Sequence, residues 1–480
     1  MPSASLAPTF FWHDYETFGR VPRRDRPAQF AGLRTDADLN EIGEPLTLYC
    51  QPAPDFLPEP EACLLTGILP QHALQHGVPE HEFAAAIERE LATPGTVGVG
   101  YNSIRFDDEV TRFLFWRSLI DPYAREWQNG CGRWDLMDAL RCAWALRPEG
   151  IEWPRHEDGR PSFKLEHLSA ANGIAHESAH DALSDVRATL GMARLLKARQ
   201  PRLWDFCLKL RDKNAVRQEI GVDRPFLHLS GRYPAERGCM AVVWPLAPHP
   251  SNKNELIVWD LAEDPAQLEG LDAETVRQRL YTRADELPEG VQRLPIKTVH
   301  LNKSPIVIGK LKTLGAAAER FGVDLGAAER HAREAAAVSA RVASLWPAVF
   351  TRPDAGADVD VDEDLYGGFI GNDDRRTLQH LRELSPKALA ERRPAFADSR
   401  LPELLLRYRA RNYPDTLNAD ERAQWQRHCA ARLHEGAGGA LTLERYFDAI
   451  DKLAEDADDA QQALLSALYD YGEAIAPEGA

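Results

Sequence analysis

The chain has 480 residues, of which 44% are hydrophobic, and its mean hydropathy is −0.42. This length predicts two or three domains, and no apolar stretch approaches the ~18 residues that a membrane-spanning helix requires. Seven scattered cysteines without C-x-x-C spacing argue against a disulfide framework or a zinc knuckle. Because the N-terminus also lacks the apolar stretch of a signal peptide, we expect a soluble cytoplasmic protein that does not engage a membrane.

The net charge of −17 argues against a nucleic-acid enzyme, because polyanions are usually bound by a basic surface. The charge is unevenly distributed, however. Residues 293–312 carry five basic residues and no acidic one, whereas residues 451–480 carry eight acidic residues and one lysine. An enzyme with a local basic path and acidic outer faces would bind single-stranded nucleic acid and adhere less to bulk duplex. A pair of barrel strands with solvated lysines explains the 293–312 run equally well, and both interpretations stay open.

From the N-terminus to about residue 200, strand-like apolar runs are mixed with helical patterns. The strand-like runs are at 10–12, 46–49 and 96–101, and the helical patterns are near 81–92, 108–120, 134–146 and 180–198. Strands mixed with helices around carboxylates at strand ends are typical of an α/β sheet whose edge holds a functional site.

The first apolar run ends in two acidic residues, Asp14 and Glu16, within FFWHDYETFG (10–19). Residues two apart in a strand point the same way, so the two carboxylates would stand together. A divalent cation would offset their repulsion, and carboxylate oxygens suit Mg²⁺ or Mn²⁺ better than Zn²⁺. So short a motif also occurs by chance at a solvated strand end. We expect His13, on the opposite strand face, to have a structural role.

Two further acidic sites give this pair a chemical meaning. Asp107 lies where the run at 96–101 leads into the next helix, and the helix near 180 carries His180 and Asp185 in its first two turns. Together with Asp14 and Glu16, the set supplies four carboxylates for two cations and one imidazole that can take a proton from water.

The order D-x-E, then Asp at a helix start, then H-x4-D resembles the DEDDh exonucleases, and the wider sequence resembles the bacterial exonuclease I family. The similar segments are GYN (100–102), RFDDEVTR (105–112), LRPEGI (146–151), LEHL (165–168), VHLNK (299–303) and YRARNYP (408–414). The resemblance implies a multidomain α/β protein: a ribonuclease H-like DEDDh exonuclease domain over 1–200, an SH3-like β-barrel domain with a helical extension over 201–354, and a C-terminal helical domain over 355–480.

The patterns beyond residue 200 agree with this division. Short apolar runs at 239–244, 256–261 and 299–308 are broken by Pro, Asn and Gly and predict a small β-rich domain. Ala-rich segments at 315–349 favour helices, and helical patterns at 374–392, 401–412, 418–434 and 440–475 predict a bundle. The acidic stretch 353–364 predicts an exposed connector, with a boundary near 355.

The expected activity is Mg²⁺-dependent 3′→5′ hydrolysis of single-stranded DNA to 5′-mononucleotides, with Mn²⁺ as a possible substitute. The site chemistry suggests that Asp14, Glu16 and Asp185 bind one ion, which holds the attacking water, and that Asp14 and Asp107 hold the second. His180 would be the general base. The resemblance adds processive action in DNA repair and recombination.

Further residues are candidates for DNA contacts. Leu65 and Ile68, in LLTGILP (64–70), resemble the segment that lines the pocket for the terminal nucleotide. Family positions that contact DNA are matched by Arg112, Tyr123, Trp127 and Arg141. Lys164 stands where the family has Arg, so the bidentate fork is lost and its substrate role is in question. Lys303, in the basic run, is a further candidate. Each of these residues has an ordinary alternative as a packing or surface side chain.

The resemblance also implies a contact with the C-terminal tail of single-stranded DNA-binding protein, for which Arg147 and nearby basic residues are candidates, and we expect a monomer. Two other functions stay open. A DEDDh exoribonuclease that trims RNA 3′ ends shares the same five residues, and a nucleic-acid-binding module without turnover would bind strands and release no nucleotide.

Overall fold

The computed structural model describes residues 8–176, 181–221, 223–351 and 359–476. The chain divides into two compact units. The first unit comprises residues 1–132, 176–187 and 357–480, and the second comprises residues 133–175 and 188–356. No helix of the described ranges is long and apolar enough to cross a membrane. The limits of the three consecutive domains stay a prediction.

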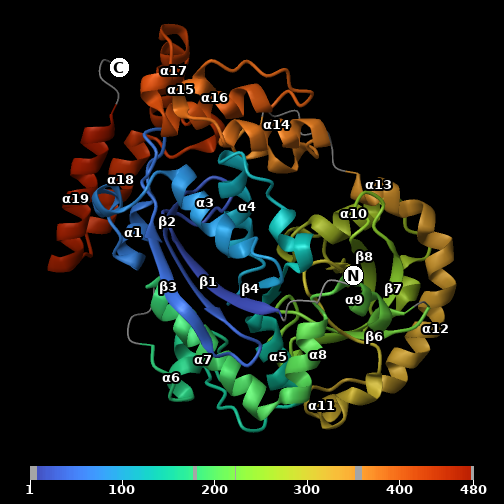
Figure 1. Ribbon diagram of the computed structural model, residues 1–480. Helices are drawn as coiled ribbons and strands as arrows, with labels where there is room; N and C mark the ends of the chain where they lie inside the picture. The colour runs from blue at the N-terminus through green and yellow to red at the C-terminus, as the bar shows by residue number, and fades with distance from the viewer. Residues whose placement is uncertain (1–7, 177–180, 222, 352–358, 477–480) are drawn as a thin grey trace, which may run out of the picture. The chain divides into compact units, whose positions relative to one another are not determined.

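A five-stranded sheet has the order β3-β2-β1-β4-β5 (Figure 1). Its strands are β1 Thr9–Thr17, β2 Pro27–Thr35, β3 Glu41–Tyr49, β4 Thr96–Gly100 and β5 Gly132–Asp135. β1 pairs antiparallel with β2 and parallel with β4. β2 was not predicted from the sequence, because proline and glycine are rare within strands. Gly32 is needed there, since a Cβ would stand 2.3 Å from the Phe11 ring.

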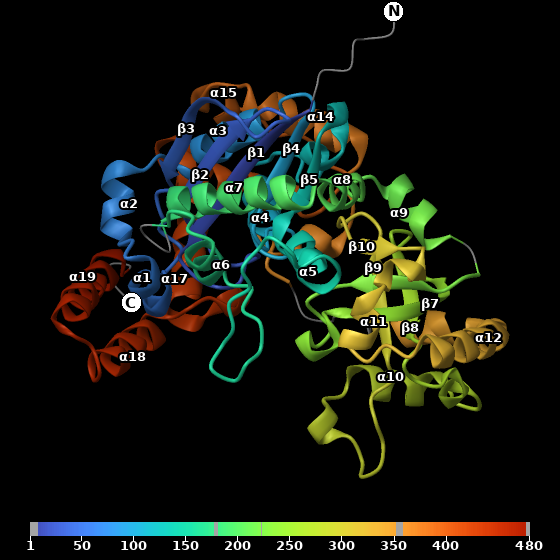
Figure 2. The ribbon, with the colours of Figure 1, turned by 90° about the horizontal axis from the view of Figure 1, so that it is seen from below.

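Different helices cover the two faces of this sheet. α3 (Glu80–Leu91) and α4 (Asp107–Arg117) pack against Phe11 and Tyr15 of β1. The start of α7 (Ala182–Arg199) lies on the opposite face (Figure 2), where the Ala182 N–H donates to Gln29 of β2. Because side chains alternate along a strand, Asp14 and Glu16 point to the face of α7. The helices predicted near 81–92 and 108–120 are confirmed.

Helices make up the rest of the first unit. They are α1 Pro60–Thr66, α2 Pro70–His76, α14 Asn372–Arg382, α15 Pro386–Ala390, α16 Leu401–Asn412, α17 Ala419–Glu435, α18 Leu443–Ala454 and α19 Asp459–Ile475. The predicted bundle is confirmed, but two of its patterns are each divided into two helices. Ser385 caps α15 ahead of Pro386, and Asp458 forms a capping box with Gln461 at the start of α19. Such caps start a new helix within a continuous apolar pattern.

The second unit contains the predicted β-rich region. Its antiparallel sheet has the order β10-β6-β7-β8-β9, formed by β6 Phe226–Leu229, β7 Met240–Pro248, β8 Glu255–Asp260, β9 Ile296–His300 and β10 Ile306–Ile308. The predicted run 299–308 is two strands, because Ser304 has a positive φ of 46° before Pro305. The helices are α5 Leu136–Leu146, α6 Leu165–Ala171, α8 Pro201–Lys209, α9 Lys213–Ile220, α10 Ala273–Tyr281, α11 Ala316–Arg320, α12 Leu325–Val342 and α13 Trp346–Phe350.

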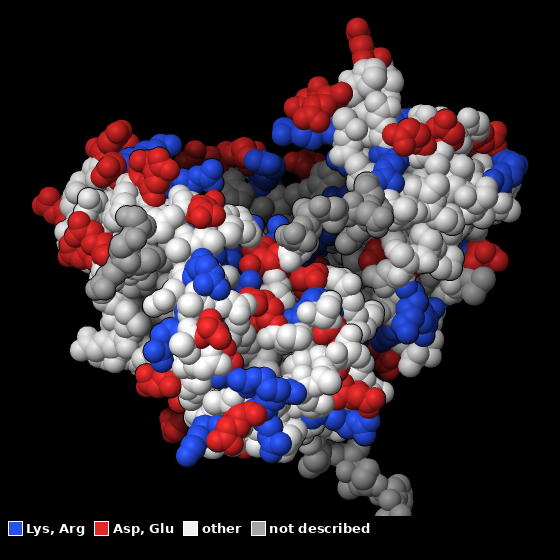
Figure 3. Space-filling view, turned by 90° about the horizontal axis from the view of Figure 1, so that it is seen from above, with Lys and Arg blue, Asp and Glu red and all other residues white. Residues whose placement is uncertain are grey.

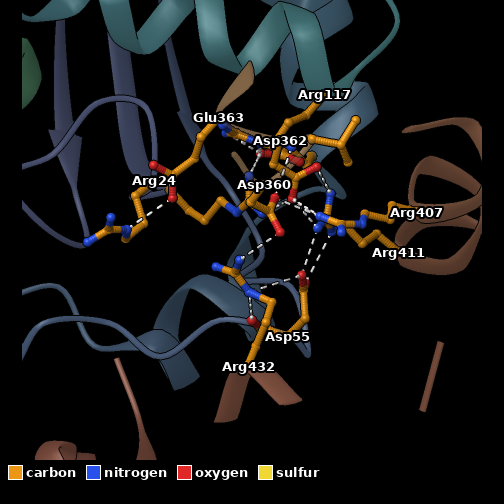
Figure 4. A network of polar contacts seen from close by, with 12 residues as sticks. Arg24, Asp55, Arg117, Asp360, Asp362, Glu363, Arg407, Arg411 and Arg432 are labelled. Carbon is orange, nitrogen blue, oxygen red and sulfur yellow. Dashed lines mark hydrogen bonds and ion pairs between the residues drawn. The ribbon is translucent and has the colours of Figure 1, made fainter. Parts of the chain in front are cut away.

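The expectation of an exposed acidic connector is wrong for the part of 353–364 that the structure describes. Asp362 and Glu363 are buried, Asp360 is half-buried, and arginines contact all three carboxylates (Figure 4). Arg407 donates to Asp360 at 2.7 Å, and Arg26 donates to Asp362 at 3.1 Å. We call this group the arginine cage; its members are Arg24, Arg26, Arg407, Arg411 and Arg432 with Asp55, Asp360, Asp362 and Glu363. The sequence predicts a solvated acidic stretch because the arginines that pair with these carboxylates lie far away along the chain.

Candidate active site

Three of the predicted acidic residues meet at the end of β1. Asp14, Glu16 and Asp185 each present an oxygen, and these oxygens lie within 4.8 Å of one another. Asp14 and Glu16 come from β1, and Asp185 comes from the first turn of α7. The start of α7 is docked on β2, where the Ala182 N–H donates to Gln29 Oε1 at 3.3 Å. Two distant segments thus form one cluster of carboxylates.

Asp107 lies beside this cluster, at the first residue of α4. Its Oδ1 accepts the Tyr15 N–H at 3.2 Å, between the two acidic residues of β1. The Thr111 hydroxyl lies 2.8 Å from the Asp107 carbonyl and 3.0 Å from the Tyr15 hydroxyl, which fastens the helix turn to the strand. The predicted acidic residues of the first unit therefore converge, although Asp107 comes from a different element.

The cluster resists ionisation in the absence of a cation. Burial, together with the charges of Asp107, Glu16 and Asp185, raises the pKa of Asp14 well above its usual range. Burial, followed by Asp185 and Asp107, raises the pKa of Glu16 to about 8. A divalent cation reverses this penalty, and an all-oxygen donor set suits a hard cation. The residues present therefore fit a divalent metal site.

His180, the expected general base, lies outside the described residues. His176, which was not predicted from the sequence, is hydrogen-bonded through its Nε2 to Asp185 Oδ1. A second histidine four positions before His180 was the available signal. Since a hydrogen bond to a carboxylate fixes its orientation, His176 orients Asp185 in the cluster.

His13 lies on the strand face opposite to Asp14, as predicted. Its ring stacks on Phe30 with centroids 6.0 Å apart. Burial, together with the charge of Arg125, lowers the pKa of His13 to about 4. The imidazole is therefore a neutral member of the core between β1 and α4.

The two candidates for the terminal nucleotide differ in exposure. Leu65, on α1, is 55% exposed, whereas Ile68 is 7% exposed and packs with Phe18 and Cys63. An exposed leucine can contact a base directly. The environment of Ile68 matches the core-packing alternative, and the substrate roles of both residues stay predictions.

The candidates near α4 also differ. Arg112 is bound by Glu126 at 2.7 Å and by Glu109 at 2.7 Å, and its guanidinium lies 5.3 Å from the Tyr123 ring centre. Its charge is thus already balanced. Trp127, in contrast, is 66% exposed and presents a free aromatic face of the kind on which unpaired bases stack.

The remaining candidates belong to the second unit. Arg141 is held by Asp138 at 2.6 Å and lies over the Phe163 ring. Lys164 is the more accessible cation, because 62% of its side chain is exposed while it pairs with Glu166 at 3.4 Å. Lys303 is half-buried. On the surface face seen in Figure 3, basic and acidic side chains are intermixed, so the negative net charge does not produce a uniformly acidic face there.

Residues 11–192, which carry the carboxylate cluster at the end of β1, match the family model described as Exonuclease, so the protein belongs to the nuclease class. Residues 211–352 match the Exonuclease I SH3-like domain, and residues 359–475 match the Exonuclease I C-terminal domain. The chain belongs to the exonuclease I family. The predicted multidomain α/β architecture is confirmed by these matches.

Members of this family match the chain over nearly its full length. The chain is 44% identical to exodeoxyribonuclease I of Escherichia coli, covering 97% of this chain and 98% of that protein. Exonuclease I of Methylocaldum szegediense superposes with a TM-score of 0.91 at 47% identity, covering 98% of this chain and 99% of that one. The zinc-bound complex of E. coli exonuclease I with single-stranded DNA superposes with a TM-score of 0.92 at 43% identity, covering 98% and 100%.

Proposed function

We propose that this protein is a divalent-metal-dependent exonuclease that degrades single-stranded DNA from its 3′ end to 5′-mononucleotides, processively and in DNA repair and recombination. The convergence of Asp14, Glu16 and Asp185 oxygens within 4.8 Å carries this proposal. The single-stranded DNA and zinc in the complex of the E. coli relative support a DNA substrate and a divalent ion. Mg²⁺ is the proposed physiological ion, with Mn²⁺ as a substitute.

The metal ligands would come from the described residues. Asp14, Glu16 and Asp185 would hold one ion, and Asp14 with Asp107 would hold the other. Two such ions, when bound, provide a nucleophilic water and offset charge on the phosphoryl and leaving oxygens. His180 would accept the proton of that water, since a neutral imidazole is abundant near neutral pH. This last role rests on the sequence resemblance.

A labelled strand tests the proposal. A 5′-labelled single-stranded DNA should give a shortening ladder with Mg²⁺, and EDTA should abolish it. Asp185→Ala should lower the rate at least about 100-fold, whereas Asp448→Ala, at an exposed position on α18, should leave it unchanged. Equal cleavage of a circular strand would indicate an endonuclease, and faster digestion of a matched RNA oligomer would indicate the exoribonuclease instead.

A pocket in the second unit supports the proposed contact with the tail of single-stranded DNA-binding protein. It has a volume of about 500 Å³ and combines the cations Arg147, Arg202 and Lys310 with the apolar side chains of Leu203 and Phe206. Such a lining suits a short peptide that carries both carboxylates and an apolar side chain. A labelled tail peptide should therefore lose affinity with Arg147→Ala and keep it with Arg283→Ala, an exposed arginine of the same unit.

Two further proposals concern the state of the molecule. We propose that the protein acts as a monomer, since one chain contains all five residues of the DEDDh set. Light scattering of the purified chain tests this. We also propose a cytoplasmic location, where its DNA substrate would be found, and cell fractionation tests this.

A further inference from the structure

A buried ion pair adjoins the site and is not used by the proposed chemistry. Arg125 donates to Asp108 Oδ1 at 2.7 Å, and the two side chains are 1% and 2% exposed. Arg125 comes from the short 3-10 helix Ala124–Glu126, and Asp108 is the second residue of α4. Asp108 is therefore the immediate chain neighbour of Asp107.

The Arg125–Asp108 ion pair is not an efficient way to stabilise the fold. Among the described residues, Arg125 Nε and Nη1 are buried and have no hydrogen-bond partner. Removing a guanidinium from water costs free energy that a single hydrogen-bonded pair repays only in part. An apolar pair of similar volume would often be as stable or more stable. A partly satisfied ion pair at this position points to a positioning role.

The first turn of α4 shows what the pair positions. No side chain caps this helix, and its first three residues are Asp107, Asp108 and Glu109. Successive residues of an α-helix are rotated by about 100°, so the three carboxylates point in different directions. Asp107 accepts the Tyr15 N–H, Asp108 is held by Arg125, and Glu109 is held by Arg112 at 2.7 Å. Three directional contacts fix the rotation of the turn about its axis.

We propose that Arg125 is a positioning residue: by holding Asp108 it sets the rotation of the first turn of α4 and so directs the Asp107 carboxylate toward the second cation. The proposal rests on the proposed function, because it assigns Asp107 to a metal. Arg125 touches neither the substrate nor the cation and acts only through Asp108. Its loss therefore weakens metal binding even in protein that remains folded.

The opposite end of α4 provides a matched control. Arg117 donates to Glu80 Oε1 from Nε at 3.0 Å and from Nη2 at 2.7 Å, and it is as deeply buried as Arg125. Each arginine forms one buried ion pair that involves α4. Arg125 binds Asp108 of α4, whereas Arg117 is itself a residue of α4 and binds Glu80. Arg117 lies at the last residue of α4 and Asp107 at the first, so loss of the Arg117 pair leaves the first turn in place.

The experiment compares Arg125→Met, Arg117→Met and the unaltered full chain. Electron paramagnetic resonance measures binding of Mn²⁺, at a temperature at which circular dichroism shows each variant to be folded. We expect Arg125→Met to raise the Mn²⁺ dissociation constant about ten-fold, the loss typical of a residue that orients a metal ligand. Arg117→Met should lower the melting temperature without changing Mn²⁺ binding. Arg125→Lys keeps the positive charge and one donor nitrogen for Asp108, so it should restore most of the Mn²⁺ affinity.

Kinetics on a short DNA strand add a second measurement. Arg125→Met should lower kcat at subsaturating Mg²⁺ and recover when Mg²⁺ is raised, while KM for DNA stays unchanged. Unchanged Mn²⁺ binding in Arg125→Met would overturn the proposal, whatever the effect on melting temperature. If Arg125→Met does not fold, Asp108→Asn takes its place, with weaker Mn²⁺ binding expected and unchanged binding contradicting the proposal. A wild-type chain that binds no Mn²⁺ would instead refute the proposed function.

Discussion

Two clusters of buried carboxylates in the first unit have opposite electrostatics. In the acidic site, burial and neighbouring carboxylates raise the pKa of Asp14 and Glu16. In the arginine cage, burial alone would raise the pKa of Asp55, but Arg411 and a hydrogen bond from His428 hold it well below its usual range. The same type of group is thus harder to ionise in one cluster and easier to ionise in the other.

The difference separates a site from a structural element. The cage carries its own cations: Arg411 contacts both Asp55 and Asp362 and is 2% exposed (Figure 4). Its charges are complete without a ligand, so its residues stabilise the fold. In the acidic site, the charged groups that act on Asp14 and Glu16 are other carboxylates, which raise the pKa of both. The same unit neutralises the buried carboxylates of the cage with arginines. A buried cluster whose carboxylates raise one another's pKa is therefore a candidate ligand site.

The largest expected effect comes from changing a carboxylate of the acidic site. Asp14→Asn keeps the side-chain volume and removes one of the repelling charges. Nuclease activity should fall at least about 100-fold. The metal-free protein, however, should melt about 2 °C higher near pH 8, because an unfavourable buried charge is gone. Calorimetry with EDTA and a strand-digestion assay check both halves.

Asp362→Asn is the control for this change. Asp362 faces Arg26, Arg407 and Arg411, so the same chemical replacement should lower the melting temperature there. If both replacements destabilise the metal-free protein, the two clusters do not differ in the way proposed.

The second largest effect concerns the cage itself. Arg411→Met removes the partner shared by Asp55 and Asp362 and leaves two buried carboxylates short of a cation. Breaking a buried ion pair costs about 3–5 kcal/mol in the free energy of unfolding. Urea denaturation should show this loss, while the Mn²⁺ dissociation constant of the folded protein stays unchanged. An altered metal affinity with unaltered stability would contradict the division between the clusters.

The sequence alone predicted much of the acidic site, and for a physical reason. Asp14 and Glu16 are local, since strand alternation places them together without knowledge of the rest of the fold. Joining them to Asp107 and Asp185 rested on the placement of these residues at helix starts and on their shared chemistry, because no rule of spacing brings three separate elements to one point. The Arg125–Asp108 pair carried no motif and was missed.

The cage escaped prediction for the related reason that its partners are spread over the chain. Asp362 meets Arg26 and Arg411, which lie far away on either side in the sequence. Composition identified the stretch 353–364 as acidic and assigned it to the surface, the usual place for such a run. Only the tertiary fold shows that arginines contact three of these carboxylates. Strand β2 was missed for a similar reason. Its proline and glycine disfavour a strand, and they are tolerated because β2 pairs with β1 and β3 in the folded sheet.

The next prediction concerns pH and follows from the raised pKa values of the acidic site. Glu16 has a pKa of about 8 in the folded protein, against about 4.5 as its ordinary value. The folded state therefore binds more protons than the unfolded state between these pH values, and stability falls as the pH rises through this window. Without metal, the melting temperature should fall by about 3 °C from about pH 5 to about pH 8.

Added Mg²⁺ should change this dependence. Because a metal ion binds the ionised carboxylates, it displaces their protons and binds more tightly as the pH rises. Calorimetry in Mg²⁺ should therefore show little or no loss of stability over the same range. Asp14→Asn should lack this difference between EDTA and Mg²⁺. A metal-independent pH profile in the wild-type protein would show that the cluster is already neutralised from within.

The smallest expected effect lies at the edge of the cage and tests whether burial decides the strength of its ion pairs. Arg23 contacts Glu363 at 3.0 Å, as Arg24 does, but 58% of the Arg23 side chain is exposed. An exposed partner gains little, because water and salt screen the attraction. Arg23→Ala should therefore cost less than about 1 kcal/mol by urea denaturation, and the loss should shrink at high salt. The loss from Arg411→Met should not, since that pair is shielded from solvent. A comparable cost at both positions would mean that the number of arginines around the carboxylates, rather than their burial, holds the cage together.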